Sequence, residues 1–140
     1  MLDGRTCEDL FEVVIHTADE TWDQGHWKLE VTADGTTTSF LIPFTGNTVG
    51  VVNNDGPVLF SLAPRWECVT DGPNTSCGEV PGTYELRVTI EGKPQNVTIN
   101  LQRDGMQAGT RLFLPEYLPT APSPECAYMC ERSKAEWILP

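Results

Sequence analysis

Apolar residues recur at every second position along several stretches of this chain, and this spacing constrains the fold more than any other feature. In the segment HWKLEVTA, residues 26–33, apolar side chains fall on one side of an extended strand and polar side chains on the other. The same alternation runs through residues 84–90 and residues 97–101. Strands of this kind bury one face and leave the other in water, so the sequence predicts an all-β protein built from packed layers.

The second and third of these segments follow each other closely and predict a hairpin. A two-residue loop at positions 92–93 would place Val88 opposite Val97. In the same register Leu86 would lie opposite Ile99, so both strands would turn their apolar sides the same way.

Weaker alternation predicts further strands, separated by Asp–Gly pairs in which glycine supplies the positive φ of a tight turn. The further strands are residues 10–18, 37–44, 48–53, 57–63, 109–115 and 133–139, and the Asp–Gly turns are residues 34–35, 55–56 and 104–105. About nine short strands at this spacing predict one antiparallel β-sandwich domain over residues 1–140, with an immunoglobulin-like arrangement as the commonest version.

Two segments interrupt this rhythm. Residues 64–82 hold several prolines and glycines and are predicted to form a long loop. Residues 115–125, PEYLPTAPSPE, are predicted to form a proline-rich arm that crosses to the last strand in an extended, polyproline-like conformation. Long loops on a sandwich often carry binding sites.

Five cysteines indicate an oxidising compartment. Cys68 and Cys77 lie within the predicted loop, and a bridge between them would close about ten residues and stabilise the fold by roughly 2–3 kcal/mol. Cys126 and Cys130 are predicted to form a second, smaller bridge that fixes the proline-rich arm. Three residues separate this pair and no histidine follows it, so neither a thioredoxin-type pair nor haem attachment fits.

Cys7 makes the cysteine count odd. It could be a free thiol, an intermolecular partner, a lipidated residue, or a partner of Cys126 or Cys130. The preceding residues GRT lack the apolar and small side chains of a lipoprotein cleavage site, which disfavours lipid on Cys7. A zinc site would need the distant cysteines to converge, because zinc requires four good ligands.

The two histidines flank one short segment. If residues 10–18 and 26–33 form a hairpin with Ile15 opposite Trp27, then the two imidazoles lie opposite each other on the outer face. Together with the carboxylates between them they could hold zinc or copper, the alternative being ordinary solvent-facing side chains. The candidate ligands are His16, His26, Asp19, Glu20 and Asp23.

The three carboxylates alone form a candidate calcium site, because hard cations prefer several oxygen ligands, although the spacing of an EF-hand is absent. No other cofactor is predicted. Trp22, Trp66 and Tyr117 fall in predicted loops and form a candidate binding surface that could stack on sugars or anchor a protein partner. Alternatively they cover the ends of the core. Trp27 and Trp137 share the parity of apolar neighbours and are predicted core residues.

The balance of charge argues against several classes of partner. Twenty acidic and nine basic residues give a net charge of −11, which repels nucleic acid and anionic lipid, so no nucleic acid partner is predicted. No apolar run approaches the roughly 18–20 residues that span a bilayer. The sequence contains no phosphate-binding glycine loop, nucleophile elbow or HExxH motif, and we predict no catalysis. A hydrolase with paired carboxylates remains an alternative.

The runs TWDQGHWKLEVTADGTTTSF and PECAYMCERSKAEWIL resemble a group of small exported bacterial β-sandwich proteins, which are often lipid-anchored. In that group a tryptophan, a glycine and alternating apolar residues precede an Asp–Gly turn, and two close cysteines precede the final strand. The spacing of the cysteines and the missing lipidation signal are departures. The matching residues are Trp22, Gly25, Trp27, Leu29, Val31, Asp34, Gly35, Cys126 and Cys130. The resemblance implies an envelope location and no particular activity.

These observations predict a noncatalytic exported protein that acts through protein contacts, as an accessory or structural subunit at a bacterial cell envelope. The expected contact surfaces are the proline-rich arm, the long loop at residues 64–82 and the strand edges, which offer unpaired backbone groups to a partner. We expect the export signal to have been removed from this chain and the protein to lie in the periplasm, on the outer surface or outside the cell. The alternative is a carbohydrate-binding module that uses the three loop aromatic residues, with calcium as a possible ligand.

Overall fold

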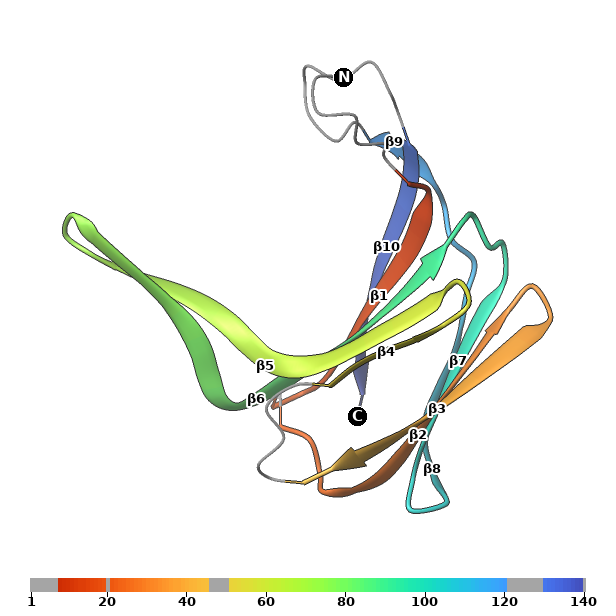
Figure 1. Cartoon of the computed structure of the whole chain (residues 1–140), viewed down its shortest axis with the longest axis horizontal. Helices are drawn as coiled ribbons and strands as arrows, with labels where there is room; N and C mark the ends of the chain where they lie inside the picture. The colour runs from red at the N-terminus through yellow and green to blue at the C-terminus, as the bar shows by residue number, and fades with distance from the viewer. Residues whose placement is uncertain (1–7, 20, 46–50, 121–129, 140) are drawn as a thin grey trace.

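The structure is a computed structural model that describes residues 8–19, 21–45, 51–120 and 130–139. Within these residues the chain forms ten β-strands and no helix (Figure 1). The strands are β1 (Leu10–Thr17), β2 (Gly25–Ala33), β3 (Thr36–Phe44), β4 (Val51–Asp55), β5 (Val58–Asp71), β6 (Asn74–Glu91), β7 (Val97–Arg103), β8 (Met106–Phe113), β9 (Leu118–Thr120) and β10 (Cys130–Leu139). No helix long and apolar enough to cross a membrane occurs in this described part of the chain.

The strands form two sheets that enclose one core, as predicted for a β-sandwich. The larger sheet has the order β4-β5-β6-β1-β10-β9 and the smaller sheet the order β3-β2-β7-β8. The prediction of a purely antiparallel sandwich is wrong at one place, because β1 and β10 pair in parallel, from Leu10 opposite Arg132 to Thr17 opposite Leu139. Parallel neighbours need a long connection, and here almost the whole chain lies between them. The immunoglobulin-like arrangement stays a prediction.

Alternation along the strands places the apolar side chains between the sheets, as the sequence predicts. Trp27 and Trp137 both belong to this core. The larger sheet contributes Phe11, Val13, Ile15, Val58, Phe60, Leu62, Tyr84, Leu86, Val88, Ile90, Trp137 and Leu139. The smaller sheet contributes Trp27, Leu29, Val31, Phe40, Ile42, Phe44, Val97, Ile99, Leu101 and Phe113. Burial of these side chains is the main force that holds the two layers together.

The predicted Asp–Gly turns all lie between paired strands. Asp34 and Gly35 join β2 to β3 with φ of 47° and 88°, and Asp104 and Gly105 join β7 to β8 with φ of 51° and 79°. Positive φ at both central residues twists the turn in the sense that the flanking strands require. Gly56, with φ of 57°, lies in the turn between β4 and β5.

The predicted hairpin between residues 84–90 and 97–101 is wrong. Val88 and Leu86 lie in β6 of the larger sheet, whereas Val97 and Ile99 lie in β7 of the smaller sheet. Val88 pairs with Val13 and Phe60 within its own sheet. The two apolar faces therefore oppose each other across the core instead of lying side by side.

Residues 92–96 cross between the sheets at this point, and polar groups from both layers hold them. The Gly92 N–H donates to the Asp9 carbonyl at 2.8 Å, just before β1. The Asp34 carboxylate accepts from the Gln95 and Asn96 N–H groups at 3.0 and 2.9 Å, from the β2–β3 turn. Because these backbone groups are hydrogen-bonded, the crossing between the sheets can form in place of the predicted tight hairpin.

Part of the proline-rich arm is a ladder strand, which corrects the prediction of a polyproline-like crossing for those residues. β9 pairs antiparallel with the start of β10, with Pro119 opposite Glu131. Proline is tolerated here because β9 lies at the edge of its sheet. The rest of the arm, residues 121–125, lies outside the described residues, as do the first residues of the predicted strand 48–53.

Candidate functional site

β5 and β6 continue beyond the sandwich as a two-stranded ribbon, residues 65–80, which projects away from both sheets (Figure 1). The predicted loop at residues 64–82 is therefore wrong. The pairing shifts register between Pro64 and Trp66 and then runs regularly from Trp66 opposite Glu79 to Asp71 opposite Asn74. Both faces of the ribbon meet solvent, so the apolar alternation that marks the other strands is missing here.

The local chemistry of the ribbon explains why it is a hairpin. Gly72 has a φ of 59° in the turn that joins the two strands. The Thr70 and Thr75 side chains form a cross-strand hydroxyl contact at 3.3 Å. Such pairs stabilise the ladder by about 0.2–1 kcal/mol each, which is small against the cost of ordering the chain.

A disulfide supplies the larger stabilisation. Cys68 and Cys77 lie directly opposite each other in the ladder, with Cα atoms 4.0 Å apart, and are bonded as predicted. An isolated two-stranded hairpin is marginally stable in water, whereas closing about ten residues covalently contributes about 2.7 kcal/mol. The disulfide also indicates an oxidising environment.

Two large apolar side chains of the ribbon stand in solvent. Trp66 is 64% exposed and Val69 is 62% exposed. Trp66 shares one face of the ribbon with the disulfide, because its strand parity matches that of Cys68. Val69 lies on the other face, beside a shallow concavity where Gly78 presents no side chain. Each face of the braced projection therefore presents one large apolar side chain to solvent.

Trp22 does not belong to a binding surface, so this prediction is corrected. Its side chain is only 7% exposed, and its indole N–H donates to the Tyr84 carbonyl at 3.1 Å. Its ring also contacts the Trp27 ring edge to face, with centroids 4.9 Å apart. Trp22 therefore closes one end of the core, as the alternative interpretation of the loop aromatic residues holds.

Tyr117, like Trp22, has a structural role. Its hydroxyl donates to the Pro94 carbonyl at 2.6 Å, and its partly buried ring packs against the core. Burial, with a smaller effect of the nearby Asp34 carboxylate, raises the pKa of Tyr117 to about 12, so the phenol stays neutral and keeps its donor proton. Only Trp66 of the three predicted aromatic residues is an exposed platform.

The predicted histidine pair does not form. β1, which carries His16, lies in the larger sheet, and β2, which carries His26, lies in the smaller sheet, so the predicted hairpin with Ile15 opposite Trp27 is wrong. His16 instead contacts the Glu136 carboxylate on β10, with Nε2 and Oε1 2.9 Å apart. The connection fails to form a hairpin because the buried Trp22 directs the chain across the end of the core.

The loop carboxylates are engaged locally. Asp19 accepts hydrogen bonds from the Thr21 and Thr17 hydroxyls and the Thr21 N–H, and these bonds, the Thr21 hydroxyl first, hold its pKa below the usual value. Asp23 forms an ion pair with Arg103 at 2.8 Å. Glu20 lies outside the described residues. Within the described residues, no three His, Cys, Asp or Glu side chains are grouped so that they could hold a metal ion.

Cys130 begins β10, is buried, and is bonded in a disulfide. Because Cys68 and Cys77 bond to each other, its partner is one of the remaining cysteines, Cys7 or Cys126. Both lie outside the described residues, and so does the predicted Cys126–Cys130 pairing.

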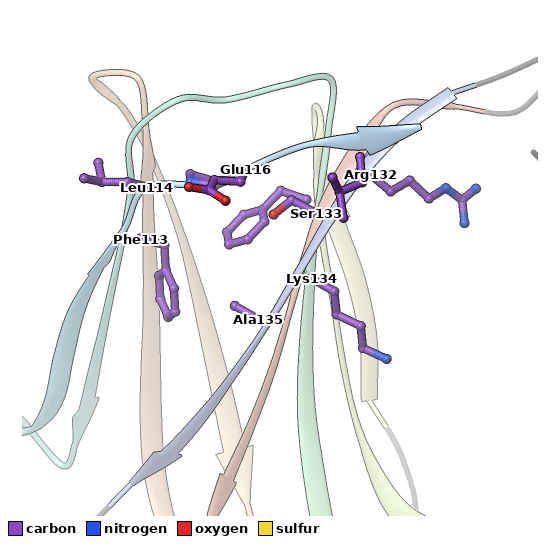
Figure 2. Close-up of a pocket in the computed structure, with 10 residues that line it drawn as sticks. Phe113, Leu114, Glu116, Arg132, Ser133, Lys134 and Ala135 are labelled. Atoms are coloured by element: carbon purple, nitrogen blue, oxygen red, sulfur yellow. The ribbon is translucent and has the colours of Figure 1, made fainter. Parts of the chain in front are cut away.

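A groove of about 560 Å³ opens beside β10, where residues 114–117 cross from β8 to β9 (Figure 2). Phe113, Ser133 and Ala135 line it, and Leu114 and Leu118 stand exposed around it. The sequence analysis did not predict this groove. The sequence feature that could have predicted the groove is the small size of Ser133 and Ala135. These residues share the inward face of β10 with the large Trp137.

The fold and the ribbon define a disulfide-braced β-sandwich with a solvent-exposed projection. Comparison with known proteins finds no matching family model, no matching curated protein and no matching solved structure.

Proposed function

We propose that the protein is a noncatalytic exported interaction module, and that the ribbon of residues 65–80 is its main contact surface for a protein partner at a bacterial cell envelope. The observation that carries the proposal is the combination of a covalent brace with two exposed apolar side chains on a projection that adds nothing to the core. Ordering an exposed hairpin costs conformational entropy, and a contact function accounts for that cost.

The chemistry of the ribbon fits a protein partner. Trp66 and Val69 supply anchors on opposite faces, and tryptophan is the residue type most enriched among energetically dominant contact residues. The ribbon carries Glu67, Asp71 and Glu79 against one base, Arg65, so a partner with a basic rim around an apolar pocket is favoured. The resemblance to exported bacterial proteins adds the envelope location to the proposal.

A photo-crosslinking experiment tests the proposal. A benzophenone amino acid at Val69 is expected to capture a discrete protein from envelope extracts of the source organism, and Trp66→Ala in the same chain should abolish the adduct. The matched control places the probe at Met106, which is 74% exposed but lies at the β7–β8 turn. Identical adducts from both positions, or none from Val69, would refute a contact role for the ribbon.

The carbohydrate alternative now depends on Trp66 alone, because Trp22 is buried and the Tyr117 hydroxyl is engaged with the Pro94 carbonyl. A single exposed ring is a weaker sugar platform than the three that the sequence predicts. Saturable binding on a glycan array that is lost in Trp66→Ala would establish this alternative in place of the protein partner.

A further inference from the structure

One edge of β10 is covered over only part of its length. β9 pairs with Cys130–Arg132, and β1 pairs along the opposite edge as far as Leu139. Among the described residues, no strand pairs with Ser133–Leu139 on the β9 side. We call this stretch the open edge of β10.

Backbone direction shows which groups the open edge presents. The Glu131 N–H donates to the Asp9 carboxylate at 2.7 Å, on the β1 side. Backbone groups alternate between the two edges of a strand, so Lys134, Glu136 and Ile138 direct their N–H and carbonyl groups to the open edge. These groups provide a ladder for one more strand in the direction of β9.

Side chains next to the open edge divide between two environments (Figure 2). Ser133 and Ala135 lie on the groove side with Phe113, and both are small, so the volume of about 560 Å³ remains above them. Farther along β10, Leu139 fills the corresponding space, because a Cβ on Gly109 would lie 2.9 Å from its Cδ2 atom. Large apolar side chains therefore fit opposite Ser133 and Ala135.

The other face of β10 carries the bases Arg132 and Lys134, followed by Glu136, whose carboxylate contacts His16 at 2.9 Å. Arg132 and Lys134 extend away from the groove in Figure 2, and the Lys134 side chain is 70% exposed. Its amine lies 3.9 Å from the Glu12 carboxylate, which also contacts Arg87 at 3.5 Å. In a chain with a net charge of −11, two neighbouring bases at an uncovered strand edge select for a partner with an acidic side chain.

We propose that the open edge of β10 binds an extended segment of a protein partner as an added antiparallel strand. Alternate apolar side chains of this segment fill the groove, and an acidic side chain on its outer face lies opposite Lys134. The inference rests on the proposed interaction function and gives it a second contact with defined chemistry.

Binding of a synthetic peptide tests whether the open edge of β10 accepts an added strand. The probe is a capped, fluorescein-labelled seven-residue peptide, Val-Thr-Val-Thr-Val-Glu-Val, matched in length to Ser133–Leu139. One control peptide replaces the glutamate by lysine. The other, Val-Val-Val-Thr-Thr-Glu-Val, keeps the composition of the probe but breaks its alternation. Fluorescence anisotropy is expected to show saturable binding of the probe, about fivefold weaker binding of the lysine peptide, and no binding of the rearranged peptide.

Variants separate the backbone ladder from the charge. Lys134→Ala should abolish the preference between the glutamate and lysine peptides. Lys134→Pro should abolish binding of both, because it removes an N–H that faces the open edge and spares the bonds to β1. Amide chemical shifts of the wild-type protein provide a measurement that needs no variant: the probe should perturb β10 and Phe113, and perturbations confined to the ribbon or to β3 would overturn the proposal.

Two further outcomes would also overturn it. Dimerisation of the wild-type chain that Lys134→Pro abolishes would assign the open edge to a second copy. Failure of the probe to bind while crosslinking from Val69 persists would refute the added strand and leave the ribbon as the contact surface, so the two proposals fail independently.

Discussion

Removal of the Cys68–Cys77 disulfide is expected to loosen the ribbon and leave the sandwich almost unchanged. The bridge closes about ten residues, which corresponds to about 2.7 kcal/mol of chain entropy, or a roughly 100-fold change in an equilibrium constant. In most proteins this energy appears in the global unfolding equilibrium. Here the residues it restrains are exposed, so the reduced ribbon can open while the core stays folded.

The double variant Cys68→Ala, Cys77→Ala tests this with native-state hydrogen exchange. Ribbon amides that pair across the ladder, such as that of Val69 or Ser76, should lose up to roughly 100-fold in protection. Amides of β2 and β7 should keep their protection. The free energy of unfolding obtained from urea titration should change by less than about 1 kcal/mol. A uniform loss over ribbon and core, or unchanged protection in the ribbon, would show that the ribbon is not an independent unit.

Two further predictions concern the aromatic side chains that the sequence grouped together. Trp22→Ala should lower the free energy of unfolding by about 3–5 kcal/mol, because it empties a buried site and removes the hydrogen bond to the Tyr84 carbonyl. Trp66→Ala should change the free energy of unfolding by less than about 0.5 kcal/mol, and equal values from urea titrations of the two variants would contradict the assignment. Tyr117→Phe should cost about 1 kcal/mol at neutral pH through loss of the bond to Pro94. Because the folded pKa of Tyr117 is raised to about 12 from 10.0, its contribution is complete below pH 10 and is lost as the pH rises toward 12. Chemical denaturation at pH 9 and pH 11.5 should show wild-type protein losing more stability than Tyr117→Phe, and parallel losses would refute this.

The sequence predicts which face of each strand is buried and fails to predict which strands are neighbours. Val88 and Val97 have the same alternation whether they lie side by side in one sheet or face each other across the core, because a period of two reports only burial. The turn residues carry more information. Asp34-Gly35 and Asp104-Gly105 are correct hairpins because their backbone requires glycine, whereas Pro94, which cannot donate to a ladder, lies next to the incorrect one.

The sequence indicated the candidate site through its two cysteines and through Trp66, which was predicted to belong to a binding surface. The spacing of Cys68 and Cys77 predicts the bridge, but it does not distinguish a stapled loop from a stapled ladder. A ribbon with two wet faces has no hydrophobic period, so composition rich in proline and glycine led to the loop prediction. The histidine hypothesis failed for a different reason: it assumed that consecutive strands pair, and the burial of Trp22 turns the chain to the other sheet.

Both proposed contacts lie on the larger sheet, and its strand order explains why. β6 extends into the ribbon and also pairs with β1, which in turn pairs with β10. The smaller sheet completes the core with its own four strands. The ribbon of residues 65–80 and the open edge of β10 therefore belong to the same layer, in which only β1 lies between β6 and β10. A partner that bound both would contact one rigid sheet, so the second contact would form at high effective concentration once the first was made.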